Sequence, residues 1–215
     1  MKEGNPQFSQ EFIEEFEQLL CWRRDVRSFK TTALEPGLVD ELLEKSLRYS
    51  PSVGNAQPWR IVRVEGASTR KAVRAHVESE NKRSASIYDD ETAAHYAQLK
   101  LHGLDAAPEQ LAVFSVIDPE EGKGLGRQTM NETLTWSTVM AIHTLWLMAR
   151  ANGIGLGWVS ILQPDKMNQL LDCPAEWRFI GYFCLGIPKE ESETPDLVKA
   201  KWQERLPTEQ LIYKI

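Results

Sequence analysis

The stretch RRDVRSF, residues 23–29, places three arginines around a single acid, Asp25, in a chain with 31 Asp and Glu against 25 Lys and Arg. Guanidinium groups stay charged and bind phosphate through paired hydrogen bonds, so the cluster is a candidate clamp for a phosphomonoester. Its members are Arg23, Arg24 and Arg27. The competing interpretation is a surface ion-pair patch around Asp25, and this segment taken alone favours that patch.

A second candidate is the glycine-rich run GIGLGW, residues 153–158. A dinucleotide-binding fingerprint follows a strand and opens a helix. This run instead follows a predicted helix and opens a predicted strand, so we favour a helix C-cap at Gly153 and a tight turn into the strand. A close backbone approach to a flat ligand remains open, because glycines carry no side chain that would block it.

The histidines and serines do not form the pattern of a metal or hydrolase site. None of the four histidines has a Cys, His or Asp partner at ligand spacing, so we predict no metal. His143 falls on a helix that we expect to be buried. Ser52, Ser137 and Ser160 lack the G-x-S-x-G context of a hydrolase nucleophile.

Composition narrows the class of protein. Hydrophobic residues make up 42% of the 215 residues and charged residues 26%, which is typical of a globular chain. The net charge of −6 argues against nucleic acid as a partner. No run approaches the ~20 apolar residues of a membrane span, and MKEGNPQFSQEF has no apolar secretion signal. The three scattered cysteines indicate a reducing compartment, so we expect a cytoplasmic protein.

Two amphipathic helices are predicted to precede the first long loop. The first runs into the arginine cluster, because aromatic residues recur at four-residue spacing. These residues are Phe8, Phe12 and Phe16. Pro36 suits the first turn of the second helix, which extends to residue 47. The Pro, Gly and Asn content of SPSVGNAQPW, residues 50–59, predicts a loop that leads into a strand at 59–64.

The rest of the chain alternates irregularly between helices and strands. Residues 68–101 are polar and helix-permissive, with an exposed middle part. A helix at 130–151 is apolar round most of its circumference, which predicts burial in a core or in a subunit interface. The other predicted strands are residues 111–117, 156–161 and 178–186. This order indicates an α+β fold. We see no linker, so we predict a single domain over residues 1–215.

Several phrases, in this order and spacing, resemble the flavin-dependent nitroreductase superfamily: RRDVRSF, PSVGNAQPW, GLGWVSIL and WQERLP. LKLHGLDAAP, GLGRQTMNETL and CLGIP extend the resemblance, which covers about residues 20–207. Within the superfamily the chain is most similar to the 5,6-dimethylbenzimidazole synthases. Those enzymes carry an acid and a serine that match Asp25 and Ser160, whereas ordinary nitroreductases commonly carry a hydroxyl in place of the acid.

The resemblance implies a nitroreductase-like fold, with a mixed, mainly antiparallel sheet flanked by helices. It also implies a homodimer that binds FMN at two interface sites. The loop at residues 52–55 would serve the other subunit's site, Arg205 would bind the phosphate, and residues 80–103 would form a lid. The implied flavin-binding residues are Arg23, Arg24, Asp25, Val26, Arg27, Ser52, Gly54, Asn55, Leu99, Trp158, Val159, Ser160 and Arg205.

The implied activity is the oxygen-dependent fragmentation of reduced FMN to 5,6-dimethylbenzimidazole, the lower ligand of vitamin B12, and erythrose 4-phosphate. Reduced FMN would then be a substrate, O2 the co-substrate, and a separate flavin reductase a partner. Asp25 would act as the base, with Ser160 as a second catalytic residue. Two alternatives stay open: an NAD(P)H-dependent nitro or quinone reductase on the same fold, and a flavin carrier without turnover.

Overall fold

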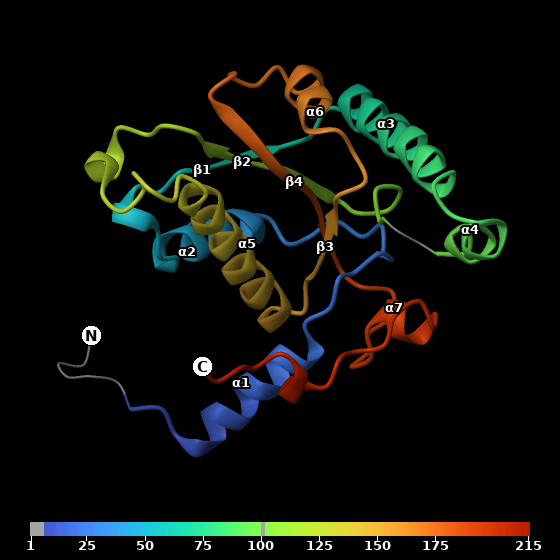
Figure 1. Ribbon diagram of the computed structural model, residues 1–215, viewed down its shortest axis with the longest axis horizontal. Coiled ribbons are helices and arrows are strands. Elements are labelled where there is room, and N and C mark those ends of the chain that lie inside the picture. Colours follow the sequence, from blue (N-terminus) through green and yellow to red (C-terminus); the bar gives the residue numbers. More distant parts are fainter. Residues whose placement is uncertain (1–6, 100–101) are drawn as a thin grey trace.

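The computed structural model of the protein describes residues 7–99 and 102–215, and its centre is a sheet with strand order β1-β2-β4-β3 (Figure 1). All neighbouring strands in it run antiparallel. The strands are β1 (Trp59–Arg63), β2 (Glu109–Val116), β3 (Gly155–Val159) and β4 (Trp177–Gly186). The four predicted strands are confirmed to within two residues at each end. Because β3 ends at Val159, Ser160 directly follows the strand.

The predicted helices are confirmed, with two additions and one correction. Pro36 does not lie in the first turn of the second helix, because Gly37 is the N-cap and adopts a φ of 82°. Two short helices, α6 after β3 and α7 after β4, were not predicted. The helices are α1 (Gln10–Trp22), α2 (Leu38–Tyr49), α3 (Ala67–Ala85), α4 (Asp90–Tyr96), α5 (Thr133–Ala151), α6 (Pro164–Leu170) and α7 (Asp196–Lys199). Three short 3-10 helices are η1 (Val53–Asn55), η2 (Glu121–Gly124) and η3 (Thr208–Gln210).

Helices cover both faces of the sheet, and each face has its own apolar core (Figure 1). Successive residues of β2 point to opposite faces, so Leu111 joins the core under α2 and α5 while Ala112 joins the core under α3 and α6. Phe183 and Tyr182 of β4 divide in the same way. The α+β class is therefore confirmed, and the sheet is a rigid support for the segments at its β3 edge.

The apolar helix α5 is only partly covered by its own chain. One side packs on the sheet, where Ile142 and Leu145 are buried. The opposite side is open: Trp136 keeps 48% and Met140 43% of its surface exposed. His143 lies on this open side too, so the expectation that it would be buried is wrong for a single chain. The three residues lie one turn apart, and they form one stripe along the helix.

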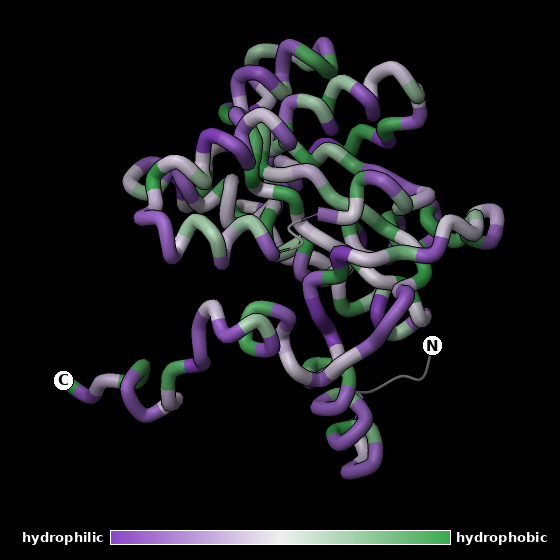
Figure 2. Tube along the Cα trace, turned by 90° about the vertical axis from the view of Figure 1, so that its right-hand side faces the viewer, coloured by the Kyte–Doolittle hydropathy of each residue, from purple (hydrophilic) through white to green (hydrophobic). Residues whose placement is uncertain are grey.

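Helix α1 and the C-terminal segment extend away from the sheet (Figure 2). None of the residues of α1 is buried. Three aromatic rings stack at its apolar side: the ring centroid of Phe12 lies 4.8 Å from that of Phe8 and 6.3 Å from that of Phe16. The predicted amphipathic helix is confirmed, but its apolar side is exposed. Within the described residues no helix is long and apolar enough to cross a membrane.

Candidate functional site

The arginine segment lies against strand β3. After α1 ends at Trp22, the chain runs parallel to β3, and Asp25 pairs with Leu156 in an isolated bridge. The main-chain N–H of Val26 donates to the carbonyl oxygen of Leu156 at 3.0 Å. Farther on, the N–H of Lys30 donates to the carbonyl of Ile187 at 2.8 Å. Sheet-type hydrogen bonds therefore hold the segment in place at both ends.

Glycine is required in β3 because the arginine segment comes so close. A Cβ on Gly157 would lie 2.0 Å from the carbonyl oxygen of Val26, and one on Gly155 would lie 2.8 Å from a methyl carbon of the same residue. The C-cap of α5 is Asn152, one residue before the Gly153 that we favoured, and Gly153 follows the cap with a φ of 71°. The run thus permits a close backbone approach, and the group that approaches is Val26 of the same chain.

Both carboxylate oxygens of Asp25 are engaged. Oδ1 accepts a hydrogen bond from the main-chain N–H of Trp158 at 2.8 Å. Oδ2 accepts one from Nε of Arg27, also at 2.8 Å, and this pair is partly buried, with 30% of the Asp25 and 16% of the Arg27 side chain exposed. The ion pair that we favoured around Asp25 is present. The carboxylate is also tied to β3, which that interpretation did not include.

The other two arginines point to different elements. The guanidinium of Arg23 lies over the ring of Trp146, 5.0 Å from its centroid. Burial lowers the pKa of Arg23, the charge of Arg24 lowers it further, Asp25 raises it, and Arg205 has a smaller lowering effect. Arg205 therefore lies near enough to the cluster for its charge to be felt there, although its side chain is exposed.

Arg24 joins helix α5 to the segment that follows β4. Its Nη1 donates to the carbonyl of Arg23 at 2.7 Å, and its Nη2 donates to the carbonyl of Glu193. The indole N–H of Trp146 donates to the carbonyl of Arg24 at 3.0 Å. Nε of Arg24 is buried and has no hydrogen-bond partner within the described part of the chain. The three arginines thus do not converge on one point, but one of them keeps a buried donor free.

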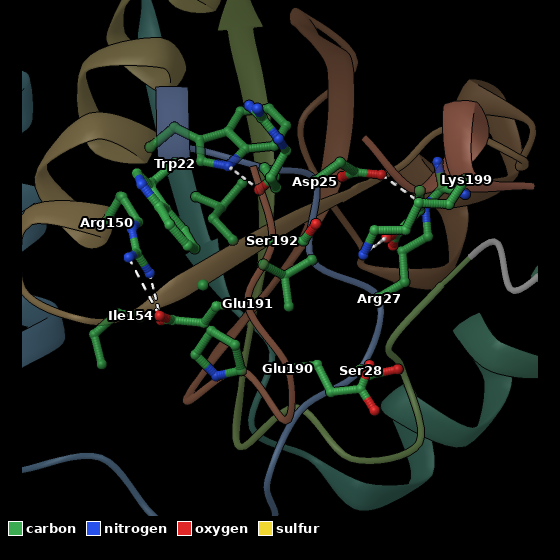
Figure 3. Close-up of a pocket in the computed structure, with 17 residues that line it drawn as sticks. Trp22, Asp25, Arg27, Ser28, Arg150, Ile154, Glu190, Glu191, Ser192 and Lys199 are labelled. Atoms are coloured by element: carbon green, nitrogen blue, oxygen red, sulfur yellow. Dashed lines mark hydrogen bonds and ion pairs between the residues drawn. The ribbon is translucent and has the colours of Figure 1, made fainter. Parts of the chain in front are cut away.

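These residues line a pocket between the arginine segment, the end of α5 and the chain after β4 (Figure 3). The predicted site residues in its wall are Arg24, Asp25, Val26 and Arg27. Its cavity volume is about 80 Å3, whereas pockets for small molecules typically measure roughly 300–1,000 Å3. This pocket by itself is therefore too small for a ligand of flavin size.

The pocket also contains residues that sequence reasoning missed. The guanidinium of Arg150 lies 5.8 Å from the ring centroid of Trp22 and forms an ion pair with Glu191, with one N···O distance of 3.3 Å (Figure 3). This hydrogen-bonded ion pair lowers the pKa of Glu191. Lys199 adds another cation. No local motif marks these residues, because they come from three segments far apart in the chain.

The loop at residues 52–55 lies elsewhere. The N–H of Val53 donates to Oγ of Ser137, near the start of α5, at 3.0 Å, whereas the arginine segment meets Trp146 nine residues later. Nine residues of helix span roughly 13 Å. Gly54 has a φ of 56° and packs against Leu125. Within one chain, the predicted residues Ser52, Gly54 and Asn55 are thus separated from the arginine segment.

The remaining predicted residues lie in β3, directly after β3, or after α4. Trp158 packs its ring 5.0 Å from that of Phe183, and its buried Nε1 has no hydrogen-bond partner among the residues described. Its main-chain N–H is occupied by Asp25 and is not available to a ligand in this conformation. Val159 is buried, Ser160 is exposed, and Leu99 is partly buried after α4. The predicted lid includes residues 100–101, which lie outside the described residues.

Comparison with known proteins fits this geometry. The sequence pattern of the nitroreductase family matches residues 20–187. A protein named 5,6-dimethylbenzimidazole synthase from Rhodobacter capsulatus is 46% identical over 94% of this chain and 97% of its own length. One of the same name from Rhodospirillum rubrum is 45% identical over 94% and 95%. Among solved structures, oxidized iodotyrosine deiodinase bound to FMN and 3-iodo-L-tyrosine has a TM-score of 0.67 at 23% identity, over 82% of this chain and 91% of that one.

The likeness to the solved structure concerns the fold, and the relatives extend it to sequence over nearly the whole chain. The family pattern covers more than half of the residues, including the arginine segment and all four strands. The chain belongs to the nitroreductase family.

Proposed function

We propose that this chain is a 5,6-dimethylbenzimidazole synthase, which uses O2 to fragment reduced FMN into 5,6-dimethylbenzimidazole and erythrose 4-phosphate. Two relatives at 46% and 45% identity over 94% of the chain carry that name. The observation that carries the proposal is Asp25, a carboxylate held between Arg27 and β3 in the wall of the pocket. Hydride transfer to an external acceptor would not require an acid in this position.

The residues of the pocket fit a ligand that carries a phosphate. Its wall holds four cations, Arg24, Arg27, Arg150 and Lys199, and an equal number of carboxylates. The group that favours an anion is therefore Nε of Arg24, a buried donor without an acceptor among the described residues. Buried donors are nearly always satisfied, so such a group favours an anionic or carbonyl-bearing ligand. Arg23 lies beside Arg24, and the charges of Arg24 and Arg205 both contribute to the lowered pKa of Arg23, so further positive charge is near this donor. When bound, reduced FMN would supply both the electrons that reduce O2 and the ring system that is cleaved.

The chain's own residues then have distinct tasks. The arginines bind and orient the phosphate and ribityl part, since a guanidinium keeps its charge. Asp25 accepts a proton from the ribityl chain, and its two hydrogen bonds fix its direction. Ser160, exposed at the end of β3, orients or relays a proton beside it. Four apolar side chains exclude water from the ring: Leu99, Val26, Trp158 and Val159. In a site open to water, O2 would be reduced without cleavage of the flavin.

A second copy of the chain completes the site in this proposal. The pocket beside the arginine segment is by itself too small for a flavin, and the loop with Ser52, Gly54 and Asn55 lies away from it. The exposed apolar stripe of α5 and the uncovered apolar side of α1 offer the contact surface. In a homodimer the loop would reach the partner's pocket. The two subunits would then form two equivalent sites at their interface.

A separate flavin reductase supplies the reduced FMN, because the reaction consumes the flavin instead of recycling it. We propose the cytoplasm as the compartment, which is supported by three cysteines without a disulfide partner. Neither a nucleic acid nor a membrane takes part in the proposed reaction.

The direct test is incubation of the purified protein with reduced FMN in air, followed by chromatography of the products. We expect 5,6-dimethylbenzimidazole in an amount comparable to the flavin consumed. If all of the flavin returns as oxidised FMN, the proposal fails. Rapid oxidation of NADH with a nitroaromatic acceptor would instead support a conventional reductase. A stable yellow protein with no loss of flavin would support a carrier.

A further inference from the structure

Four aromatic side chains form a cluster that joins α4 to the C-terminal segment. We call Tyr88, His95, Tyr96 and Trp202 the aromatic cluster. The ring of Trp202 lies 5.7 Å from that of Tyr88, with the two planes 83° apart. It lies 5.5 Å from His95 and 6.1 Å from Tyr96. Edge-to-face arrangements at such distances are favourable beyond the area that they bury, so the cluster is a specific contact.

Hydrogen bonds at both ends tie the aromatic cluster to the backbone and to α3. Nε2 of His95 donates to the carbonyl oxygen of Ala200 at 2.7 Å, because a carbonyl can only accept. The hydroxyl of Tyr96, a buried residue, donates to Oδ1 of Asn81 at 2.6 Å. The cluster thus connects α3, α4 and the residues after α7, and Figure 1 shows α7 and α4 next to each other.

Beyond the aromatic cluster the C-terminal segment is held weakly by its own chain. The N–H of Trp202 donates to the carbonyl of Leu197 at 2.9 Å, and its side chain is half-buried. Every residue from 203 to 215 is exposed. Trp202 is therefore the last point at which this segment is anchored before it reaches Arg205.

Arg205 follows Trp202 by only three residues, so its Cα lies within about 11 Å of that anchor. Lys199, three residues before Trp202, lines the pocket, and the charge of Arg205 is one of the causes that lower the pKa of Arg23. The aromatic cluster thus limits where the guanidinium of Arg205 can be. A short chain with one fixed end searches a small volume, and this increases the effective concentration of the group it carries.

We propose that Trp202, through the aromatic cluster on α4, is a positioning residue that holds Arg205 in reach of the phosphate of FMN. The inference rests on the proposed function, since it needs FMN as the ligand. Trp202 itself does not touch the phosphate in this proposal. It restricts the approach of Arg205, so its loss should weaken recognition of the phosphate and leave recognition of the flavin ring unchanged.

The test compares two ligands that differ only in the phosphate. Anaerobic calorimetric titrations with reduced FMN and reduced riboflavin measure the affinity of each variant for both. We expect Arg205→Ala to weaken FMN binding roughly ten-fold or more, the scale of one charge-assisted hydrogen bond. Trp202→Leu should weaken FMN binding by a large part of that factor. Neither change should affect riboflavin, and Trp202→Leu should add nothing to Arg205→Ala, because both act through one contact.

Two further variants separate positioning from general structural damage. Trp202→Phe keeps an aromatic ring against Tyr88 and should recover most of the lost FMN affinity. His95→Leu removes the bond to Ala200 from the α4 side and should weaken FMN binding but not riboflavin binding. If Trp202→Leu does not fold, the His95→Leu comparison decides the question in the same way.

Equal losses for FMN and riboflavin in these variants would overturn the proposal, and so would a wild-type protein that binds both ligands equally. Additive losses in the double variant would overturn it too. These outcomes are independent of the proposed function, because that is judged by dimethylbenzimidazole formation. A wild-type protein that makes the product but binds reduced FMN and reduced riboflavin with equal affinity would refute only the role of Trp202.

Discussion

The carboxylate of Asp25 accepts a hydrogen bond from the main-chain N–H of Trp158, 2.8 Å away and 133 residues later in the chain. A main-chain donor in a strand has no rotamers, so this contact fixes the acid more firmly than a pairing of two side chains would. The other oxygen accepts from Arg27. Asp25 is thereby placed at the β3 edge of the sheet, near the end of the strand that Ser160 follows.

Asp25→Asn should separate the oxidation of reduced FMN from its fragmentation. The amide keeps the shape and can still accept from the N–H of Trp158, but it cannot take up a proton. We expect the variant to bind reduced FMN and to react with O2, while the dimethylbenzimidazole formed per FMN oxidised falls at least about a hundred-fold, the lower range for loss of a general base. Chromatography of the products measures this ratio. A wild-type ratio would show that the acid serves only to pair with Arg27.

Arg27→Ala should weaken the binding of FMN by about 1.5–3 kcal/mol, because a charge-assisted contact is lost and Asp25 loses its partner. Calorimetric titration measures the affinity. Arg74→Ala is the matched control, since Arg74 pairs with Glu78 and Asp105 on an exposed surface away from the pocket. The control should leave FMN binding unchanged. Equal effects of the two variants would mean that Arg27 has no specific role.

Gly157→Ala should displace the arginine segment from β3. The new Cβ would lie 2.0 Å from the carbonyl oxygen of Val26, so we expect a loss of about 3 kcal/mol or more in unfolding free energy, together with loss of FMN binding. Gly153→Ala is the control, because nothing lies within 4 Å of its Cβ and only its φ of 71° is strained. It should cost about 1–2 kcal/mol and keep FMN binding. Urea unfolding and titration give both quantities, and similar values for the two variants would contradict the close approach.

The thiols of Cys21 and Cys184 should differ in reactivity. Burial raises the pKa of Cys184 to about 12, so its thiol stays protonated in the folded protein, whereas Cys21 is exposed. At pH 8 we expect iodoacetamide to modify Cys21 in the native protein and Cys184 only in urea, as measured by mass spectrometry of peptides. Rapid native labelling of Cys184 would show that β4 opens readily.

The same shift has a consequence for stability at high pH. The unfolded chain releases the Cys184 proton near the ordinary thiol pKa of about 8.5, but the folded chain holds it to about 12. The folded state therefore binds more protons in this window, and unfolding free energy should fall as pH rises through it. Cys184→Ala should show a shallower fall over the same range. Identical slopes would exclude this thiol as a cause.

Trp136→Glu should prevent assembly of the homodimer, because it puts a charge in the exposed apolar stripe of α5, where 48% of the Trp136 side chain is uncovered. Obligate interfaces bury roughly 2,000–5,000 Å2, so the apolar residues of α5 and α1 would be covered together. Sedimentation velocity should show a dimer for the wild type and a monomer with impaired FMN binding for the variant.

The control for this change is Lys71→Glu, which alters the charge at an exposed position of α3 and should leave the dimer intact. A wild-type protein that sediments as a folded monomer and binds FMN would contradict the assembly and, with it, the role of residues 52–55.

Local pattern was sufficient to predict most of the elements. Period-four aromatic spacing predicted α1, and the continuous apolar residues of 130–151 predicted α5. Short strands with flanking glycines placed β3 and β4 to within two residues. The arginine segment, the acid within it and the glycine run were also visible, because residue type and spacing along the chain carry these signals. The short helices α6 and α7, which have no long periodic pattern, were missed.

What joins these pieces was decided only by the tertiary structure. Asp25 meets Trp158 because Gly157 allows Val26 onto β3, and neither residue indicates the other in the sequence. The pairing of Arg150 with Glu191 and the packing of Trp202 on α4 likewise join segments far apart in the chain. Such contacts depend on which faces of the sheet and helices pack together. The spacing of residue types along the chain determines which side of each helix or strand is apolar. Which other element packs against that side depends on how the whole chain buries its apolar surface.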